Sequence, residues 1–236
     1  MHGISEHVLP LRRETLEDGV YRQLCELILK GGIVPGESIT VASLADAFAV
    51  SPMPVRNALT RLTSVGALTV ISGRTIGIPK LTRERLAEVM RVRLTVEPAA
   101  AAWAAETVIP LNLDPLRRKF QALVDNEKGG YSKIYLQANY DFHFEIYSLA
   151  GSPTMMNIIE TLWLQIAPYF HLLTTYNDFK ISQRHHEAIF NSIEHNRPEE
   201  ARQAMHGDIA DAFEVLKGFF KFIQSRCSFI QYAVLA

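Results

Sequence analysis

The hydrophobic residues of this chain follow one pattern up to about residue 80 and another pattern after it. Before residue 80, apolar residues recur at helical spacing in three short runs, and two β-prone runs then flank a short polar tip. After residue 80, apolar residues recur only at helical spacing, and glycine or proline separates the runs. The pattern predicts a mainly α protein, with a small domain at 1–80 and an all-α antiparallel helical bundle at 81–236.

The first domain is predicted to fold as a winged helix-turn-helix. The three early runs predict helices at residues 15–30, 41–48 and 51–65. The second and third of these are joined only by Ala49-Val50, and so tight a turn is typical of a helix-turn-helix. Ser51 can cap the third helix, and two prolines fall near its first turn, where a missing N–H costs least. The β-prone runs at 68–71 and 76–79 predict a hairpin, which would be the wing.

The predicted third helix has one apolar face and one face that suits DNA. Its apolar stripe is formed by Val55, Ala58, Leu59 and Leu62. The residues that we expect to contact DNA are Ser51, Met53, Arg56, Asn57, Thr60 and Arg61. In a major groove, arginine can bind guanine through two hydrogen bonds, and asparagine can do the same for adenine. Arg74 at the hairpin tip could reach a phosphate or the minor groove. The same helix pattern also fits a plain solvated face that carries two arginines.

Composition narrows the possible functions. The 236 residues are 48% apolar, which is enough for a core, and the net charge is only −1. Between residues 50 and 80, however, there are four cations and no carboxylate, so any DNA contact must come from this local patch. Cys25 and Cys227 lie far apart, which favours a reduced, cytoplasmic compartment. We find no secretory signal pattern and no apolar stretch long enough to span a membrane, so we expect no membrane partner.

The run from Gly36 to Lys80 resembles the DNA-binding domain of GntR-family transcription regulators. The matching residues are Pro35-Gly36, Leu44-Ala45, Ser51, Pro54-Val55-Arg56, Ala58-Leu59, Arg61-Leu62 and Gly66. The chain departs from the family at Pro52, where an arginine usually contacts DNA, and at Thr75, where the wing usually carries glycine. The resemblance implies a winged helix that binds operator DNA.

The second domain contains a candidate metal site. Asn139 and His143 are four residues apart, so both side chains lie on one face of a helix. His186 belongs to a later helix and Asp208 to the last one. An amide oxygen, imidazoles and a carboxylate that converge from three helices suit a divalent metal in a bundle core. A single histidine on a helix is, however, more often a surface residue or a satisfied core residue.

Residues 82–215 are similar to the FCD ligand-binding domain of the FadR-type branch of the same family. The matching motifs are the pair Arg93 and Glu97, and the stretches Asn139 to His143, Ala150 to Pro153, and His186 to Ile189. The resemblance implies a divalent ion (zinc, nickel or manganese) held by Asn139, His143, His186 and Asp208, although the family usually has histidine in place of Asp208. It also implies a pocket for a small carboxylate effector, with Arg93, Asn139, His143 and His186 around it.

Two residue types in this domain allow more than one interpretation. Arg93 either binds the effector's carboxylate through two parallel hydrogen bonds or forms an ion pair with Glu97 four residues later. The resemblance favours the effector role. Trp103, Trp163 and Tyr169 are candidates for lining the pocket, but aromatic residues at helical spacing are more often plain core.

The sequence therefore predicts a ligand-responsive transcription regulator that is not an enzyme. We expect a homodimeric repressor on near-palindromic operator DNA, controlled by a small organic acid. One alternative is a regulator of the same family whose carboxylate pocket contains no metal. Another is a metalloenzyme in which His143, His186 and Asp208 hold a catalytic ion. The apolar run after Lys217 has no explanation in the sequence beyond an extension of the last helix.

Overall fold

The computed structural model describes residues 15–73, 75–127, 133–175 and 179–233, with backbone alone at 127, 171, 173–175, 179–181 and 219–233. Its first part contains three helices and three short strands. These are α1 (Leu16–Leu29), β1 (Ile39–Thr40), α2 (Val41–Phe48), α3 (Pro52–Ser64), β2 (Thr69–Ser72) and β3 (Thr75–Gly77). The strands form one antiparallel sheet in the order β1-β3-β2. The predicted winged helix-turn-helix is therefore present, with β1 as an added strand that the sequence did not predict.

Local side-chain chemistry explains where these helices begin. Thr15 caps α1 by accepting a hydrogen bond from the Asp18 amide. Thr40 caps α2 and forms a reciprocal capping box with Ser43. Ser51 occupies the capping position of α3, as predicted, but its side chain makes no capping hydrogen bond. The start of α3 is instead fixed by proline in its first turn.

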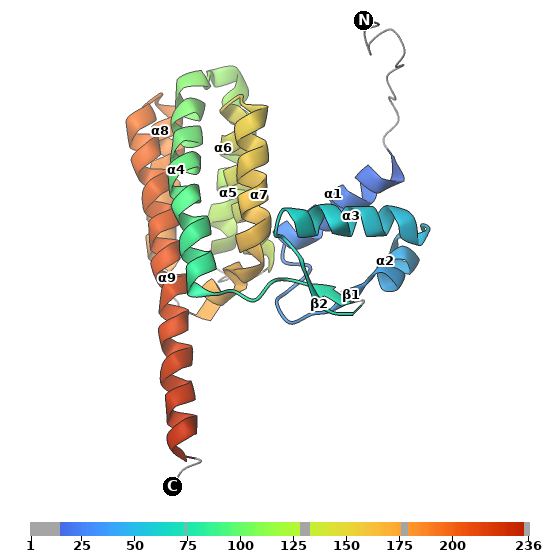
Figure 1. The fold of residues 1–236 in the computed structure, drawn as a ribbon. Helices are drawn as coiled ribbons and strands as arrows, with labels where there is room; N and C mark the ends of the chain where they lie inside the picture. Colours follow the sequence, from blue (N-terminus) through green and yellow to red (C-terminus); the bar gives the residue numbers. More distant parts are fainter. Residues whose placement is uncertain (1–14, 74, 128–132, 176–178, 234–236) are drawn as a thin grey trace, which may run out of the picture.

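The second part is a bundle of long helices. These are α4 (Arg83–Thr107), α5 (Pro110–Glu127), α6 (Lys133–Leu149), α7 (Pro153–Ile166), the 3₁₀ segment η2 (Ala167–Thr175), α8 (Phe179–Glu194) and α9 (Pro198–Ala233). In Figure 1 the helices stand side by side, the winged-helix part lies beside α7, and α9 continues well beyond the bundle. None of the helices in the described part of the chain is long and apolar enough to cross a membrane. The mainly α fold with an N-terminal winged helix is confirmed.

Pro98 and Pro168 act differently from each other. A proline within a helical pattern predicts a kink or a break, but α4 runs through Pro98 as one helix whose alanine-rich inner face is buried. The apolar pattern from Thr154 to Thr175 predicts one long helix. The structure instead ends α7 at Ile166 and continues as a 3₁₀ segment that contains Pro168. Proline cannot donate to the preceding turn, and the tighter winding begins one residue before it.

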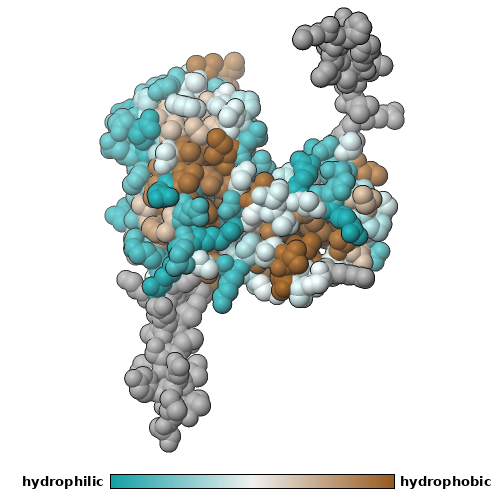
Figure 2. All heavy atoms as spheres, viewed as in Figure 1, coloured by the Kyte–Doolittle hydropathy of each residue, from teal (hydrophilic) through white to brown (hydrophobic). Residues whose placement is uncertain are grey.

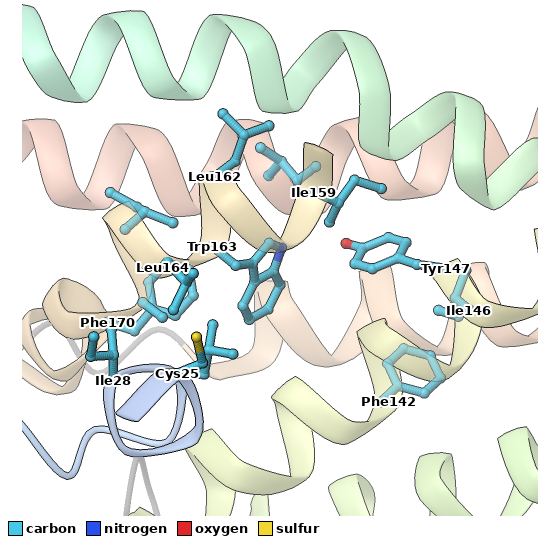
Figure 3. Packing of buried hydrophobic residues seen from close by; sticks show 14 of the residues in the cluster. Cys25, Ile28, Phe142, Ile146, Tyr147, Ile159, Leu162, Trp163, Leu164 and Phe170 are labelled. Carbon is cyan, nitrogen blue, oxygen red and sulfur yellow. The ribbon is translucent and has the colours of Figure 1, made fainter. Parts of the chain in front are cut away.

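One hydrophobic core runs through both parts of the molecule. The stripe of α3 is fully buried, as predicted, and so are Trp163, Tyr147 and Phe142 in the bundle. Figure 3 shows Cys25 and Ile28 of α1 close to Trp163 and Phe170 of the bundle. The winged helix is therefore packed against the bundle by apolar contact and is not merely tethered to it.

Two side-chain contacts add polar links between the same parts. Arg85 of α4 donates to the backbone oxygen of Gly66, which lies two residues after α3, the helix that we expect to read DNA (the recognition helix). It also donates to Gln165 of α7 at 3.2 Å. The Tyr169 hydroxyl of η2 donates to the backbone oxygen of Pro79, in the connection to α4. Consequently α7 and η2 touch both ends of the segment that leads from α3 into the bundle.

Candidate functional site

The exposed face of α3 borders a groove in the winged-helix part. Residues of α2, α3 and the β-hairpin line the groove, among them Arg56, Thr60, Val70 and Gly73. The Arg56 side chain is exposed and forms no ion pair within the described part of the chain. Ser51 and Met53 are also exposed at the start of the helix. This face therefore presents a cation and small polar groups beside the wing.

Two of the predicted DNA contacts are held by α1. The Asn57 amide donates to Glu17 at 2.8 Å. Arg61 pairs with Asp18 at 3.1 Å, and its guanidinium lies 3.8 Å from the centre of the Tyr21 ring. Hydrogen bonds from Thr15 and then Arg61 lower the pKa of Asp18. Asn57 and Arg61 can reach DNA bases only after these contacts break, which the spacing on one helix could not reveal.

The wing differs from expectation in the residues that it offers. Arg74 lies outside the described residues, so its predicted phosphate contact stays a prediction. Val70 and Ile71 of β2 are largely exposed, and Val70 lines the groove beside Arg56. A bulge in the pairing of β2 with β3 falls between Val70 and Ser72 and breaks the simple in-and-out alternation of the strand. The alternation alone would have placed one of the two apolar side chains inside.

In the bundle, three predicted ligands come together. His143 of α6 and His186 of α8 turn their Nε2 atoms to each other at 3.4 Å. The Asp208 carboxylate of α9 lies 3.5 Å from the first and 3.4 Å from the second. All three donor atoms lie within 4.8 Å of one another, and both histidines are buried. Two imidazoles and a carboxylate in this arrangement fit a divalent ion with room for further ligands.

His143 and Asp208 also border a small cavity of about 40 Å³, whereas His186, which we expected around the pocket, is not part of its lining. Its polar lining consists of Arg93, Asn139, His143, Ser182 and Asp208. Trp163 and Phe170 contribute apolar walls, so one of the three aromatic candidates lines the pocket. Trp103 lies instead on the outside of the bundle, and Tyr169 contacts Pro79. A cavity of this size holds an ion with one or two small groups, because a single water needs at least about 10–15 Å³.

A buried network sets the orientation of His143. Tyr147 donates its hydroxyl hydrogen to Glu97 at 2.6 Å, and its oxygen lies 3.2 Å from Nδ1 of His143. Because that oxygen has given its hydrogen to Glu97, it accepts one from Nδ1 of His143. The hydrogen on Nδ1 leaves Nε2 with its lone pair, which faces His186 and Asp208. The imidazole is thus held in the tautomer that a metal requires.

Glu97 is the centre of this network, which the sequence showed only as one half of an Arg-Glu motif. Trp163 donates its indole N–H to the same carboxylate oxygen as Tyr147, at 3.2 Å. Figure 3 shows the Trp163 indole nitrogen and the Tyr147 hydroxyl turned toward the same region. Arg93 binds the carboxylate through Nε at 2.6 Å and Nη2 at 3.2 Å. The buried carboxylate therefore accepts four hydrogen bonds.

The ion pair predicted as one alternative for Arg93 is present, but it is buried and not exposed. Burial alone would lower the pKa of Arg93, yet attraction to Glu97 raises it above the ordinary value. The side edge of the guanidinium, formed by Nε and Nη2, is occupied by Glu97. The hydrogen-bond partner of Nη1 among the described residues is the sulfur of Met90. Since Arg93 also lines the cavity, the other edge of the guanidinium is the part that can meet a ligand.

Burial disfavours charge on both His143 and Asp208. Burial, followed by the proximity of His186 and Arg93, holds the pKa of His143 well below 6.5, so its ring is neutral at pH 7. Burial also raises the pKa of Asp208, against the attraction of His186, His185 and Arg93. A divalent cation would favour the ionised carboxylate and would use the neutral imidazoles as ligands.

The fold is typical of two-domain regulators, in which a winged helix-turn-helix precedes an all-α bundle that binds a ligand. The chain belongs to the GntR family of bacterial regulatory proteins, as a member with an FCD domain. Residues 16–78 match the family model for gntR bacterial regulatory proteins, and residues 88–211 match the model for the FCD domain. The predicted resemblance is confirmed, and the protein is a DNA-binding transcription regulator and not an enzyme.

Relatives support this assignment. The chain is 32% identical to the HTH-type transcriptional regulator McbR of Escherichia coli K12 over 143 residues, which are 61% of this chain and 65% of McbR. This match spans slightly less than two thirds of McbR. The chain is 25% identical to the HTH-type transcriptional repressor NanR of Enterobacter sp. 638 over 225 residues, or 86% of both chains. Among solved structures, E. coli McbR/YncC aligns with a TM-score of 0.79 at 25% identity, covering 88% of this chain and 100% of that one.

Proposed function

We propose that the protein is a cytoplasmic, homodimeric repressor whose bundle binds a divalent metal ion and a small carboxylate effector. The observation that carries the proposal is the convergence of His143, His186 and Asp208 beside a small cavity that Arg93 also borders. When bound, the ion would supply positive charge and open coordination positions for an effector oxygen. The relative NanR, a repressor by name, supports the direction of regulation.

Four residues are proposed to hold the metal. His143 and His186 would contribute Nε2, and Asp208 would contribute a carboxylate oxygen. Asn139 lines the same cavity one helical turn before His143, so its amide oxygen is the proposed fourth protein ligand. The buried network around Glu97 keeps His143 in place and in the right tautomer. The small cavity favours a compact acid over an extended one.

On the DNA side, Arg56 is proposed to make the principal contact from α3. It is exposed, faces the groove beside the wing, and lacks a partner within the described residues. Ser51, Met53 and Thr60 would contact DNA around it. Asn57, Arg61 and Arg74 remain predicted contacts, and the first two require release from α1.

The structure suggests a route from effector to DNA. Trp163 and Phe170 line the cavity and belong to α7 and η2. The same two elements carry Gln165 and Tyr169. Arg85 donates hydrogen bonds to both Gln165 and the backbone oxygen of Gly66, and the Tyr169 hydroxyl donates to the backbone oxygen of Pro79. We propose that an effector displaces α7 and η2 and so changes the position of α3. Such a ligand acts by binding one arrangement of the two domains better than the other.

Metal analysis of the purified protein tests the metal proposal. We expect about one divalent ion per chain, and loss of that ion in His143→Ala and His186→Ala, because each removes a buried ligand. His185→Ala is the matched control, since His185 pairs with Asp211 on the outside of α9. If neither the purified protein nor protein soaked with zinc, nickel or manganese holds an ion, the site is a metal-free carboxylate pocket, which is the alternative within the same family.

Calorimetric titration with a panel of small organic acids tests the effector site. Arg93→Lys keeps a charge beside Glu97 but loses the planar guanidinium, so we expect acid binding to weaken while metal content stays unchanged. A neutral amide analogue of the bound acid should bind far more weakly. Normal acid binding by Arg93→Lys would exclude Arg93 as the carboxylate contact.

A further inference from the structure

The outer face of α4 carries an apolar stripe that no described part of the chain covers completely. Its members, Val92, Val96, Ala99 and Trp103, follow one another at intervals of four, three and four residues, which keeps them on one helix face. Val92 and Trp103 each expose 37% of their surface. Trp103 is thus a large apolar side chain on the outside, whereas the chain's second tryptophan is buried beneath α4. Aromatic anchors of this kind are enriched at protein interfaces.

A residue of α7 extends this stripe sideways. Gln165 contacts Arg85 of α4, and Figure 1 shows α4 and α7 running in opposite directions. Seven residues, or about two turns, before Gln165 is Ile158, and seven residues after Arg85 is Val92. Antiparallel packing therefore places Ile158, which is 43% exposed, beside Val92. Figure 2 shows a continuous hydrophobic patch over this part of the bundle.

Two opposite charges stand at the ends of the stripe. Arg91 lies at one end and Glu106 at the other, both exposed. Within the described part of the chain, neither side chain makes an ion pair or hydrogen bond. The midpoint between them falls at Pro98 and Ala99, inside the apolar stripe. A second α4 laid antiparallel across this midpoint would bring Arg91 of each copy to Glu106 of the other.

We propose that this α4–α7 face is the surface on which a second copy of the chain docks, around a two-fold axis near Ala99. The inference rests on the proposed homodimer and assigns it a surface. A two-fold interface must be complementary to itself, and a cation and an anion placed symmetrically about a small apolar centre meet that condition. Ala99 allows the two helices to approach closely, and Trp103 of each copy packs near Val92 and Thr95 of the other.

The location connects the dimer axis to both functional regions. Helix α4 also carries Arg93, which lines the cavity, and its buried partner Glu97 on its inner side, and Arg85 at the end nearest α3. Pairing through α4 therefore fixes the two cavities and the two winged helices relative to one axis. Winged-helix dimers need such a fixed relation, because the recognition helices must reach two half-sites about one DNA turn apart.

Charge reversal tests the proposed pairing of Arg91 with Glu106. The dimer dissociation constant is measured by sedimentation velocity over a concentration series for Arg91→Glu, Glu106→Arg and the double variant. Each single variant should dimerise at least about tenfold more weakly, since it places like charges together twice per dimer, and the double variant should return to within about threefold of wild type. Arg118→Glu, an exposed reversal on α5, is the matched control and should leave the constant unchanged.

Trp103→Ala tests the apolar centre independently of charge. We expect dimerisation to weaken by about thirtyfold or more, as for an interface anchor, with an unchanged helical circular dichroism signal. Ile134→Ala removes an even more exposed apolar residue from α6 and should have no effect. In the wild-type protein, quenching of tryptophan fluorescence by acrylamide should fall as concentration rises, and this change should disappear in Trp103→Ala.

Two outcomes overturn the inference, and they differ in what else they affect. If the wild-type protein is a dimer but single reversals behave like Arg118→Glu, or the double variant is worse than either single one, the surface is wrong and the proposed repressor function stands. If the wild-type protein stays monomeric both alone and on operator DNA, the proposed homodimer fails as well.

Discussion

The recognition helix and the bundle cavity both depend on polar side chains, but they hold them in opposite ways. Around α3 the polar groups are exposed, and partners on α1 compete for them, as Asn57 and Arg61 show. Beside the cavity, the groups around Glu97 are buried, and this carboxylate accepts four hydrogen bonds. Exposed contacts are weak and exchangeable, which suits a surface that must accept DNA. Buried contacts are costly to leave unmade, which suits a site that must keep its shape.

The sharpest test of this comparison is Glu97→Ala. The variant leaves Arg93 as a buried charge and removes the acceptor of Tyr147 and Trp163, so we expect a loss of about 3–5 kcal/mol in the free energy of unfolding. Glu97→Gln keeps the volume and one acceptor oxygen and should lose less. The measurement is urea denaturation followed by circular dichroism.

Its counterpart on the recognition side is Asp18→Ala, which removes the exposed partner of Arg61. We expect a shift in the urea midpoint far below that of Glu97→Ala, because only the exposed contacts of Asp18 with Arg61 and Thr15 are lost. Comparable losses in Glu97→Ala and Asp18→Ala would contradict the distinction between a buried and an exposed network.

Operator affinity gives the second test. Arg56→Ala should cost about 1–3 kcal/mol of operator binding if the guanidinium contacts a base through two hydrogen bonds. Asn57→Ala should cost less, because the free protein already uses this amide on Glu17. Fluorescence anisotropy at one fixed salt concentration compares the two. An Asn57→Ala variant that loses more than Arg56→Ala would show that α1 releases Asn57 on DNA.

The sequence predicted those features that follow from spacing along one helix. The α3 stripe is of this kind. The set of His143, His186 and Asp208 lies on three helices and was predicted mainly from the resemblance to the FCD domain, and the structure brings these three side chains together. Features that depend on long-range contacts were missed: the hydrogen bonds from Tyr147 and Trp163 to Glu97 join residues 50 and 66 positions apart. The hydrogen bond from Asn57 to Glu17 of α1, which lies 40 positions away, was missed for the same reason. No periodicity within one element reports which neighbour will face it.

The interface between the two regions should give the smallest effect, and it depends on pH. Glu160 of α7 is half-buried, and burial raises its pKa above 4.5. It lies near Tyr21 and Cys25 of α1 and near Tyr140 of α6. Burial above all, with a minor contribution from the Glu160 charge, raises the pKa of Tyr21 to about 12. The burial of this carboxyl is intermediate between that of the exposed acids of α1 and that of the fully buried Glu97.

The raised pKa of Glu160 decides how this residue changes folding stability with pH. As pH rises from 4.5, Glu160 of the unfolded chain ionises first, so folding stability falls until the pH passes the folded-state pKa and then stays constant. Glu160→Gln should therefore be more stable than wild type at pH 7 and equal to it at pH 4. The gain should stay below about 1 kcal/mol, because water screens a half-exposed carboxyl. Thermal melts of both proteins between pH 4 and pH 7 give the difference directly. A variant that is less stable than wild type at pH 7 would show that the ionised carboxylate binds a partner, and that the interface resembles the Glu97 network more than the surface of α3.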